Sequence, residues 1–513
     1  MSETRPLLGG TNATSQSSIF SKRNVSIAVI VTIAVAVVYS LTNGPAKPVK
    51  LEDKITRQNL VAHLQDFSNI AAKYNGSRSV KDGYLASAAY TEEQLKQTDY
   101  EVTVQHFTFP YFEKYAPGSL QFSGSAGQSL VSGKDFEPFR NSGSGSVKDT
   151  PVQGVSGGCK TSDFATFTKG NVALIAREAP VGSAPESCIY REKIKNAYLA
   201  GASAVLVYSA LPGEGPLAGG TPVEATSLPI LGLSHAVALH VLQRLAVDHA
   251  LTVSLTSAVR FVDFKTVNVI ADTKGGDANN VVVAGSHLDS VPAGPGINDD
   301  ASGSSATLAV ALALYKSGLS KNVVNKVRFA WWSAEELGLI GSNYYVDDLA
   351  KNNPDELKRI ALNLNNDMIA SPNGARFIYN GREAVDPKLR GPSGVIQTIF
   401  ENYFDSKGLA HEPTEFDGRS DYGGFLRYGI PAGGLFTGAE VIKTEEQAKK
   451  FGGTAGIAFD PCYHEKCDTL ENIQGLGISL FTELAGSMGH IVQKLAYVKD
   501  LRGFLAGGKE ETA

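Results

Sequence analysis

The chain has 513 residues, 42% of them hydrophobic, which is too long for one ordinary domain and predicts two or three domains with large cores. Its 47 lysines and arginines against 52 aspartates and glutamates give a net charge of −5, a balance that argues against nucleic acid as a partner. The four cysteines fall as two local pairs, Cys159 with Cys188 and Cys462 with Cys467; this suits disulfides in an oxidising lumen, with four free buried thiols as the alternative.

Residues 25–42 form a run of 18 residues without a charge. As a helix this run spans about 27 Å, just enough to cross a bilayer. Lys22 and Arg23 precede it, which favours a cytoplasmic tail over residues 1–24 and a lumenal remainder. We therefore expect an uncleaved signal anchor and a single-pass type II membrane protein. A cleaved signal peptide, which would make the protein secreted, is the alternative; the polar residues before the run and Pro45 in the nearby small-residue pattern disfavour it.

Two short signals fit this topology. The tail segment Glu3-Thr4-Arg5-Pro6-Leu7-Leu8 resembles an acidic dileucine signal, which implies a sorting adaptor as partner and delivery to a vacuole, lysosome or endosome. Asn75-Gly76-Ser77 is an N-glycosylation acceptor that is usable only on the lumenal side, with Asn75 as the modified residue.

The segment after the anchor changes character twice. Residues 51–100 carry helical apolar spacing, and residues 100–109 alternate like a strand. Residues 117–150 are rich in glycine and serine, and we expect a domain boundary there.

Residues 152–262 have a different composition, with buried strands expected at 172–175 and 204–208 and a helix at 189–201. The segment resembles a protease-associated domain, and the resemblance implies a lid or docking unit inserted over residues 126–262 and closed by a Cys159–Cys188 bridge. The residues that carry it are Cys159, Asp163-Phe164, Lys169-Gly170-Asn171-Val172-Ala173-Leu174-Ile175, Cys188, Lys193, Lys195-Asn196-Ala197, Ala200-Gly201-Ala202 and Leu228-Pro229-Ile230.

After residue 262 strands and helices alternate. Strands are expected at 267–271, 280–284, 326–332 and 360–364, and helices at 304–315 and 337–350. Such alternation predicts an α/β fold with a mostly parallel sheet flanked by helices on both faces. Ligands in sheets of this kind gather at the carboxyl ends of the strands.

Five polar segments stand at the ends of apolar runs in this region. They supply two imidazoles and several carboxylates, the ligand set that a pair of zinc ions needs, with one carboxylate left to act on a water molecule. The segments are Ser286-His287-Leu288-Asp289, Gly296-Ile297-Asn298-Asp299-Asp300, Ser333-Ala334-Glu335-Glu336, Asn365-Asn366-Asp367-Met368 and Cys462-Tyr463-His464-Glu465-Lys466-Cys467-Asp468. We therefore expect a metallohydrolase.

Each segment also has a plain structural interpretation. His287 can bind a metal while Asp289 holds its second ring nitrogen, if the strand persists that far, but a lone histidine after a strand is more often structural. In the second segment a carboxylate can bridge two ions, and a neighbour such as Asp300 can cap the following helix. Glu335 and Glu336 can divide into base and ligand, or can be a solvated acidic pair at a helix start.

The order of these residues resembles the di-zinc leucyl aminopeptidase family, closest to its vacuolar aminopeptidase Y type with an inserted protease-associated domain. The resemblance covers most of the chain after residue 50 and implies a zinc exopeptidase domain over residues 50–125 and 263–505. The elements that carry it are His287, Asp299, Glu335-Glu336, Asp367, Gly418-Arg419-Ser420-Asp421-Tyr422 and His464.

The resemblance also implies a role for each residue. One zinc ion takes His287 and Asp367, a second takes Glu336 and His464, and Asp299 bridges the two. Glu335 is the general base, Tyr463 donates to the oxyanion and Arg419 lies in the substrate pocket, with a cis peptide at Asp299-Asp300.

The expected activity is that of a metallo-aminopeptidase that removes N-terminal, leucine-like residues from peptides. A zinc carboxypeptidase or dipeptidase of the same superfamily is the alternative among enzymes. A non-catalytic membrane receptor of this fold is the alternative that is not an enzyme. The presence of all expected ligands and of the base disfavours it.

Overall fold

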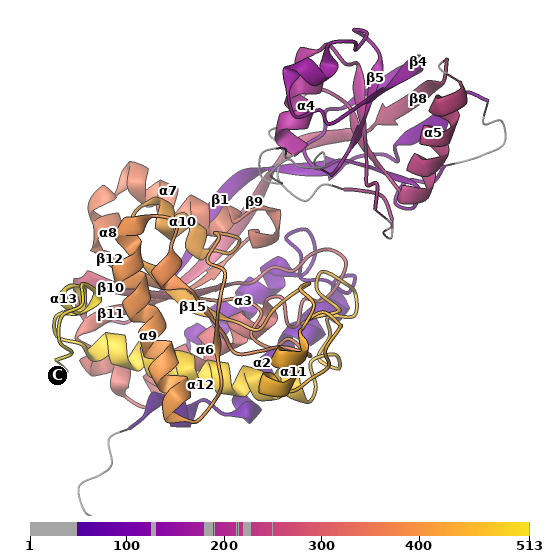
Figure 1. The fold of residues 1–513 in the computed structure, drawn as a ribbon. Coiled ribbons are helices and arrows are strands. Elements are labelled where there is room, and N and C mark those ends of the chain that lie inside the picture. The colour runs from indigo at the N-terminus through magenta and orange to yellow at the C-terminus, as the bar shows by residue number, and fades with distance from the viewer. Residues whose placement is uncertain are drawn as a thin grey trace, which may run out of the picture.

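The computed structural model describes residues 49–511 except 125–129, 179–187, 189, 212, 214, 219–226 and 249. The expected anchor at 25–42 and the signal at Leu7-Leu8 lie outside these residues. Within the described part, no helix has both the length and the apolar character that crossing a bilayer requires. The described chain forms two units, the first from residues 49–114 and 259–511 and the second from residues 115–258 (Figure 1).

The first unit is built around a mixed 8-stranded sheet with the order β1-β9-β11-β10-β12-β15-β13-β14. Strands β11, β10, β12 and β15 run parallel to one another. Strand β9 pairs antiparallel with both β1 and β11, and β13 pairs antiparallel with β15. The strands are β1 (Glu101–Lys114), β9 (Val259–Asp272), β10 (Asp277–His287), β11 (Asn325–Trp332), β12 (Ile360–Asn366), β13 (Phe377–Tyr379), β14 (Glu412–Thr414) and β15 (Ala432–Phe436).

Helices cover both faces of this sheet, as the alternation in the sequence predicts. They are η1 (Leu51–Lys54), α2 (Arg57–Lys73), α3 (Tyr84–Leu95), α6 (Ala301–Lys316), η4 (Leu319–Asn322), η5 (Glu335–Leu337), α7 (Ile340–Asn352), α8 (Pro354–Arg359), η6 (Gly381–Glu383), η7 (Pro387–Leu389), α9 (Arg390–Ser406), α10 (Tyr422–Arg427), α11 (Glu445–Phe451), α12 (Leu476–Tyr497) and α13 (Leu501–Leu505).

Side-chain alternation along β10 divides the core into two layers. Val282 and Ala284 pack into the cluster that holds α2, α6, α9 and α12, whereas Val281 and Val283 point to the opposite face, where α7, α8 and α10 lie. Every residue of β10 from Val281 onward is buried, which explains its continuous apolar run.

Helix α6 lies directly against the end of the sheet that carries the polar segments. Its N-cap Asp300 accepts a hydrogen bond from the backbone N of Gly303 at 2.8 Å. A Cβ on Gly303 would lie 2.0 Å from the carbonyl oxygen of Asn366 at the end of β12, so only glycine allows this approach.

The second unit contains a 7-stranded sheet with the order β2-β8-β4-β5-β6-β7-β3. Helix α4 packs on one face with Ile175 and Val205, and α5 packs on the other with Leu174 and Leu206. The elements are β2 (Ser119–Phe122), β3 (Phe136–Pro138), β4 (Gly145–Val155), η2 (Thr161–Phe164), β5 (Val172–Ala176), α4 (Tyr190–Leu199), β6 (Ala204–Tyr208), β7 (Ile230–Leu233), α5 (His235–Val247) and β8 (Thr252–Ser257).

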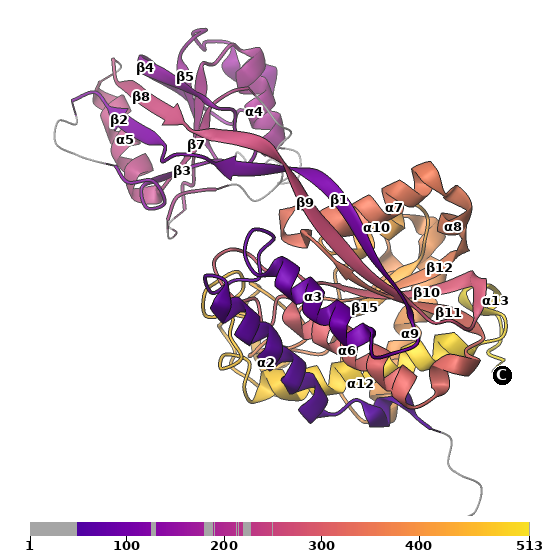
Figure 2. The same ribbon diagram turned by 180° about the vertical axis from the view of Figure 1, so that it is seen from behind.

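Strands β1 and β9 connect the two units. They pair antiparallel along their whole length, from Glu101 opposite Asp272 to Lys114 opposite Val259. Figure 2 shows them leaving the first sheet as a twisted ribbon that ends at the second unit. Both crossings of the chain between the units therefore lie side by side.

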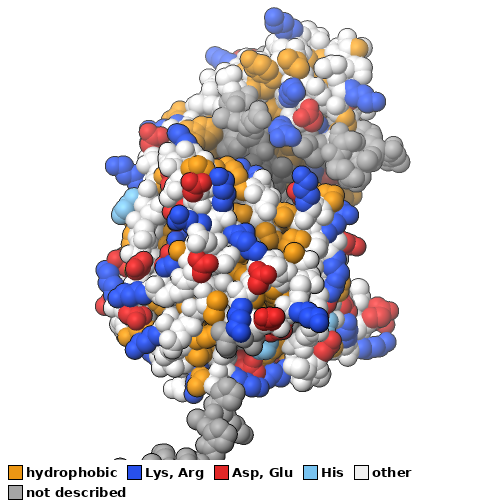
Figure 3. All heavy atoms as spheres, turned by 90° about the vertical axis from the view of Figure 1, so that its left-hand side faces the viewer, with side chains coloured by type: hydrophobic (Ala, Val, Ile, Leu, Met, Phe, Trp, Pro, Cys, Tyr) orange, Lys and Arg blue, Asp and Glu red, His pale blue; other side chains and the backbone are white. Residues whose placement is uncertain are grey.

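The second unit contains more regular structure than its sequence suggests. The glycine- and serine-rich stretch at 117–150 carries β2, β3 and the start of β4. Cys159 bonds to Cys188 in this unit, and Cys462 bonds to Cys467 in the first. Asn75 is exposed on the first unit. The face in Figure 3 mixes acidic and basic side chains over its area.

Candidate metal centre

Three neighbouring parallel strands deliver the expected site residues to one edge of the sheet. His287 is the last residue of β10, Glu335 opens η5 shortly after β11, and Asp367 directly follows β12. Asp299 comes from the loop between β10 and α6, and His464 from the loop between α11 and α12. Residues spread over 178 positions of the chain (287 to 464) thus converge at the carboxyl ends of the strands.

One set of potential ligand atoms surrounds His287. Its Nε2 lies 3.1 Å from Asp299 Oδ1 and 3.5 Å from Asp367 Oδ1. All three residues are buried.

A second set surrounds His464 and shares Asp299 with the first. His464 Nε2 lies 3.2 Å from Asp299 Oδ2 and 2.9 Å from Glu336 Oε2. The side chain of His464 is 40% exposed, whereas that of His287 is 1% exposed, so the second set is the one that opens to solvent. Asp299 directs one carboxylate oxygen to each set.

These spacings fit zinc. Ligand atoms about 2.0–2.1 Å from a tetrahedral zinc ion lie roughly 3.3 Å from one another, and the four distances range from 2.9 to 3.5 Å. Two oxygens of the shared cluster, Asp299 Oδ2 and Glu336 Oε1, are buried and accept no hydrogen bond of good geometry from any described residue. A cation would satisfy both atoms, so the donor chemistry matches the group that the sequence implies.

The electrostatics of the cluster also favour a cation. Burial raises the pKa of Glu335 well above its usual value, and the charges of Asp367 and Glu336 raise it further. Burial opposes ionisation of Asp299 as well, yet the imidazoles of His287 and His464, 3.1 and 3.2 Å from its two oxygens, hold its pKa below the usual value. For His464, burial lowers the pKa, but the nearby carboxylates of Asp299 and Glu336 outweigh it and raise the pKa to about 10. The carboxylates thus draw positive charge to this point.

Asp289 is arranged differently from the sequence expectation. The expected partner of His287 Nδ1 is the Asp289 carboxylate; in the structure Nδ1 contacts the main-chain oxygen of Asp289 at 3.1 Å, and the carboxylate oxygen is 3.7 Å away. The reason is that β10 ends at His287, so the strand alternation does not reach Asp289. The Asp289 carboxylate instead accepts a hydrogen bond from the backbone N of Glu335 at 3.1 Å.

Asp468 and Asn298, to which the sequence assigns no role, hold the backbone that carries the shared carboxylate. Asp468 accepts hydrogen bonds from the backbone N atoms of Asn298 (2.7 Å) and Asp299 (3.0 Å). The Asn298 amide in turn donates to Ser371 and Asp460. The Asp299-Asp300 peptide that these contacts flank is cis, as the resemblance implies.

A serine orients the ligand atom of Asp367. Ser420 Oγ donates to Asp367 Oδ2 at 2.5 Å and accepts from Asn365 Nδ2 at 2.8 Å. This leaves Asp367 Oδ1 directed at His287. Ser420 belongs to the segment that carries the family resemblance, so its position in the sequence marks it even though its chemistry does not.

Arg78 supports the loop after β10, a role that nothing in the sequence indicates. Its side chain is fully buried and donates to three main-chain oxygens of the loop after β10, those of Leu288, Pro295 and Gly296, at 2.5–2.8 Å. Its backbone N also donates to Ser290 Oγ at 2.9 Å. Burial lowers the pKa of this guanidinium, and the charges of Asp289 and Asp300 oppose that effect. Arg78 therefore fixes the loop that joins His287 to Asp299.

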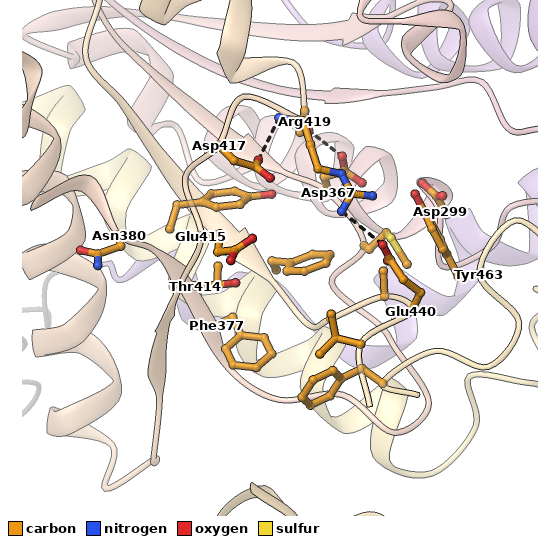
Figure 4. A pocket seen from close by; sticks show the side chains of 18 of the residues that line it. Asp299, Asp367, Phe377, Asn380, Thr414, Glu415, Asp417, Arg419, Glu440 and Tyr463 are labelled. Atoms are coloured by element: carbon orange, nitrogen blue, oxygen red, sulfur yellow. Dashed lines mark hydrogen bonds and ion pairs between the residues drawn. The ribbon is translucent and has the colours of Figure 1, made fainter. Parts of the chain in front are cut away.

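A cavity of about 490 Å³ opens beside the two donor sets. Figure 4 shows Asp299, Asp367 and Tyr463 at one end and Phe377 farther along the wall. Arg419 and Glu440 form an ion pair at 3.2 Å across this wall. The Tyr463 ring stacks on that of His464 with centroids 3.8 Å apart, in the loop that the Cys462–Cys467 bond closes.

The chain matches known proteins over both units. Residues 268–487 match peptidase family M28, and residues 147–241 match the PA domain. An aminopeptidase of Pseudomonas aeruginosa is 41% identical over 446 residues, which is 83% of this chain and 79% of that protein. Leucine aminopeptidase 2 of Arthroderma otae is 38% identical over 475 residues, or 90% of this chain and 89% of that protein.

Solved structures match the fold as well. The aminopeptidase from Aneurinibacillus sp. strain AM-1 superposes with a TM-score of 0.64 at 25% identity and covers 85% of this chain and 94% of its own. A zinc aminopeptidase from Bacillus subtilis superposes with a TM-score of 0.61 at 23% identity, over 85% of this chain and 95% of its own.

Replacing Arg78 tests its role in the loop. We expect Arg78→Met to lower the free energy of unfolding by about 3 kcal/mol or more, because buried carbonyl oxygens lose their donor. Urea unfolding measures this change, and Arg57→Met, at an exposed position of α2, is the control that should stay close to the unchanged protein. An Arg78→Met midpoint equal to that of the unchanged protein would contradict the assignment.

Proposed function

The chain belongs to peptidase family M28 and is a metallo-aminopeptidase, and from this premise we propose that it releases N-terminal, leucine-like residues from peptides with the help of two zinc ions. The observation that carries the proposal is the Asp299 carboxylate, which directs one oxygen to each of two sets of potential ligands. A non-catalytic receptor of this fold has no need of such a centre.

Two ions account for the donor atoms better than one. In the first set Asp299 Oδ1 and Asp367 Oδ1 face His287, and in the second Asp299 Oδ2 and Glu336 Oε2 face His464. A single ion could take only one of these triangles and would leave buried oxygens of the other without a partner. We propose the assignment that the resemblance implies, with Asp299 as the bridge.

Glu335 is the proposed general base. Its carboxylate lies in the cavity wall with the side chain 11% exposed, 4.0 Å from His287 Nε2, and belongs to neither donor set. When bound, zinc polarises the scissile carbonyl and lowers the pKa of a water molecule towards neutrality. Glu335 takes the proton from the attacking water and passes it to the leaving amine. The Tyr463 hydroxyl, at the cavity end beside Asp299, donates to the oxygen that becomes negative.

The charge of the cavity favours an aminopeptidase over a carboxypeptidase. Eight carboxylates line it, and among its described lining residues Arg419 is the one Lys or Arg, already paired with Glu440. A protonated substrate amine is attracted to such a wall, and a free substrate carboxylate is repelled. The carboxylates are those of Asp299, Glu335, Asp367, Glu383, Glu412, Glu415, Asp417 and Glu440.

Aromatic side chains set the preference for the first residue of the substrate. The rings of Phe377, Tyr379 and Phe436 line the cavity beyond Arg419, and Phe459 and Met368 extend the apolar wall. An apolar side chain gains by burial against this wall. The carboxylates of the cavity wall add a second basis for selectivity, because they repel a substrate that begins with aspartate or glutamate.

We also propose a location, on grounds of sequence. Residues 25–42 anchor the protein as a type II membrane protein, with the peptidase and the inserted second unit on the lumenal side. The signal at Leu7-Leu8 then directs it to a vacuole, lysosome or endosome. Support comes from the charge pattern around the apolar run, from the sequon at Asn75 and from the disulfides, which suit an oxidising compartment.

Replacing the base separates metal binding from catalysis. We expect the unchanged protein to contain two zinc ions per chain by elemental analysis. Glu335→Ala should keep both ions and lose activity by roughly 10²–10⁴-fold, because Glu335 moves a proton and belongs to neither donor set. Glu93→Ala, at an exposed position of α3, should keep full activity. One zinc ion per chain, or an active Glu335→Ala enzyme, would contradict the scheme.

The substrate terminus distinguishes the two exopeptidase classes. We expect hydrolysis of leucyl-alanine and no hydrolysis of N-acetyl-leucyl-alanine, because the free amine is the group that the acidic wall attracts. Among aminoacyl p-nitroanilides, the leucyl substrate should exceed the glutamyl substrate in kcat/KM by at least about 100-fold, or 2.7 kcal/mol. Cleavage of the acetylated dipeptide alone would favour a carboxypeptidase.

Cell fractionation tests the proposed location. In a eukaryotic host we expect the full chain to stay in the membrane pellet after alkaline carbonate extraction. Replacement of Leu7 and Leu8 by alanine should move it to the cell surface, and Asn75→Gln should remove a glycan-dependent shift in mobility. A mature N-terminus that begins after residue 42 would support the secreted alternative.

A further inference from the structure

We infer that Arg140, in the inserted second unit, is a positioning residue for the loop that carries Glu335 and Glu336. Its Nη2 donates a hydrogen bond to the main-chain oxygen of Glu336 at 2.9 Å, across 196 positions of sequence. The inference rests on the proposed function, since it concerns the geometry of the base and of one expected zinc ligand. It gives the second unit a part in the reaction beyond that of a lid or docking surface.

The loop needs support because its backbone is strained. Ala334 and Leu339 have φ of 58° and 59°, in the left-handed region that costs a non-glycine residue energy. Its internal hydrogen bonds go to two main-chain oxygens: that of Ala334 accepts from the backbone N of Leu337 (3.3 Å) and of Ile340 (3.1 Å), and that of Glu335 accepts from Gly338 (2.7 Å) and Leu339 (2.8 Å). None of these four bonds engages the Glu336 oxygen, which is left for a donor from outside the loop.

Contacts from outside reach the loop on three sides. On the first side, Asp289 Oδ1 accepts from the backbone N of Glu335 at 3.1 Å. On the second, Ala334 is buried in an aromatic cluster with Phe107 and Phe109 of the connecting strand β1. On the third, Arg140 holds the Glu336 carbonyl. Two of the three supports thus come from the connection to the second unit or from that unit itself.

Arg140 extends from a rigid part of the second unit. The residue before it, Phe139, is fully buried, stacks edge-on against Tyr190 and donates its backbone N to the Ile230 oxygen of β7 at 3.0 Å. The backbone N of Arg140 donates to the Ala218 oxygen at 2.9 Å. Because its base is fixed, the guanidinium transmits the position of the second unit to the Glu336 peptide.

The Glu336 peptide is a sensitive place for such a contact. Glu336 supplies Oε2 to the donor set around His464, and Glu335 is the adjacent residue. The Glu336 oxygen belongs to the peptide bond between Glu336 and Leu337. A rotation of this peptide therefore moves the carboxylates of both Glu335 and Glu336. A misplacement of about 1 Å in catalytic groups commonly costs up to 10²-fold in rate.

Three variants test the inference. Arg140→Met removes the donor and keeps most of the side-chain volume, and Arg140→Lys keeps the charge with a different donor geometry. Arg191→Met is the matched control, because Arg191 is a half-exposed arginine of the same unit that pairs weakly with its neighbour Glu192 at 3.8 Å. All are purified as full chains and compared by thermal unfolding first.

The first measurement needs no activity. Hydrogen exchange of the zinc-free proteins should be faster at the backbone amides of residues 335–339 in Arg140→Met than in the unchanged protein or Arg191→Met. A chelator should also remove zinc faster from Arg140→Met. Equal exchange and equal zinc loss in all three proteins would overturn the inference, whatever the substrate of the enzyme is.

The second measurement is kinetic. With zinc in excess, we expect kcat of Arg140→Met to fall by roughly 10- to 100-fold with KM for a leucyl substrate changed by less than about threefold, because the substrate pocket itself is untouched. The kcat of Arg140→Lys should lie between those of Arg140→Met and the unchanged protein. A fall that appears only in KM would assign Arg140 to substrate binding and overturn the positioning role. An inactive unchanged protein would count against the proposed function and leave the exchange result to decide on Arg140.

Discussion

The centre depends on one constraint: Asp299 must present one carboxylate oxygen to each donor set while almost completely buried. A buried carboxylate is costly unless positive charge and donors surround it. The structure provides positive charge through two imidazoles, those of His287 and His464, one at each oxygen. Asp468 holds the Asp299 peptide from the C-terminal loop, and Arg78 holds the preceding loop from the N-terminal segment. The N-terminal and C-terminal parts of the first unit therefore both hold the loop that carries the shared carboxylate.

The fold of the first unit follows from local pattern because its strands are either continuous apolar runs or regular alternations. The predicted helix at 337–350 begins three residues later, at Ile340, because Gly338 and Leu339 adopt left-handed φ that a helix cannot include. The strands at 117–150 were hidden by composition: their pairing with β7 and β8 is set by partners about 100 or more residues away, which local propensity does not contain.

The residues of the site likewise divide into those that the sequence predicts and those that only the tertiary structure reveals. His287 and Asp367 could be recognised because each ends a strand, and the order of the motifs supplied the rest. Arg78 and Arg140 could not, since an arginine in a loop is usually solvated and only the tertiary structure shows what it contacts. Asp468 stands in the last of the polar segments, but its hydrogen bonds to the backbone at Asn298 and Asp299 are visible only in the tertiary structure. Asp289 illustrates the limit of periodicity, because the alternation that was expected to aim its carboxylate ends two residues earlier.

The paired crossing strands β1 and β9 have a consequence for biosynthesis. In the first sheet β1 hydrogen-bonds to β9 alone, and Val259 leaves the ribosome 145 residues after Lys114. At about 5–20 residues per second, the nascent N-terminal helices wait roughly 7–30 s for the strand that joins them to their sheet. Early folding of the second unit would bring β1 and β9 together. The first unit would then be completed last, although its synthesis begins first.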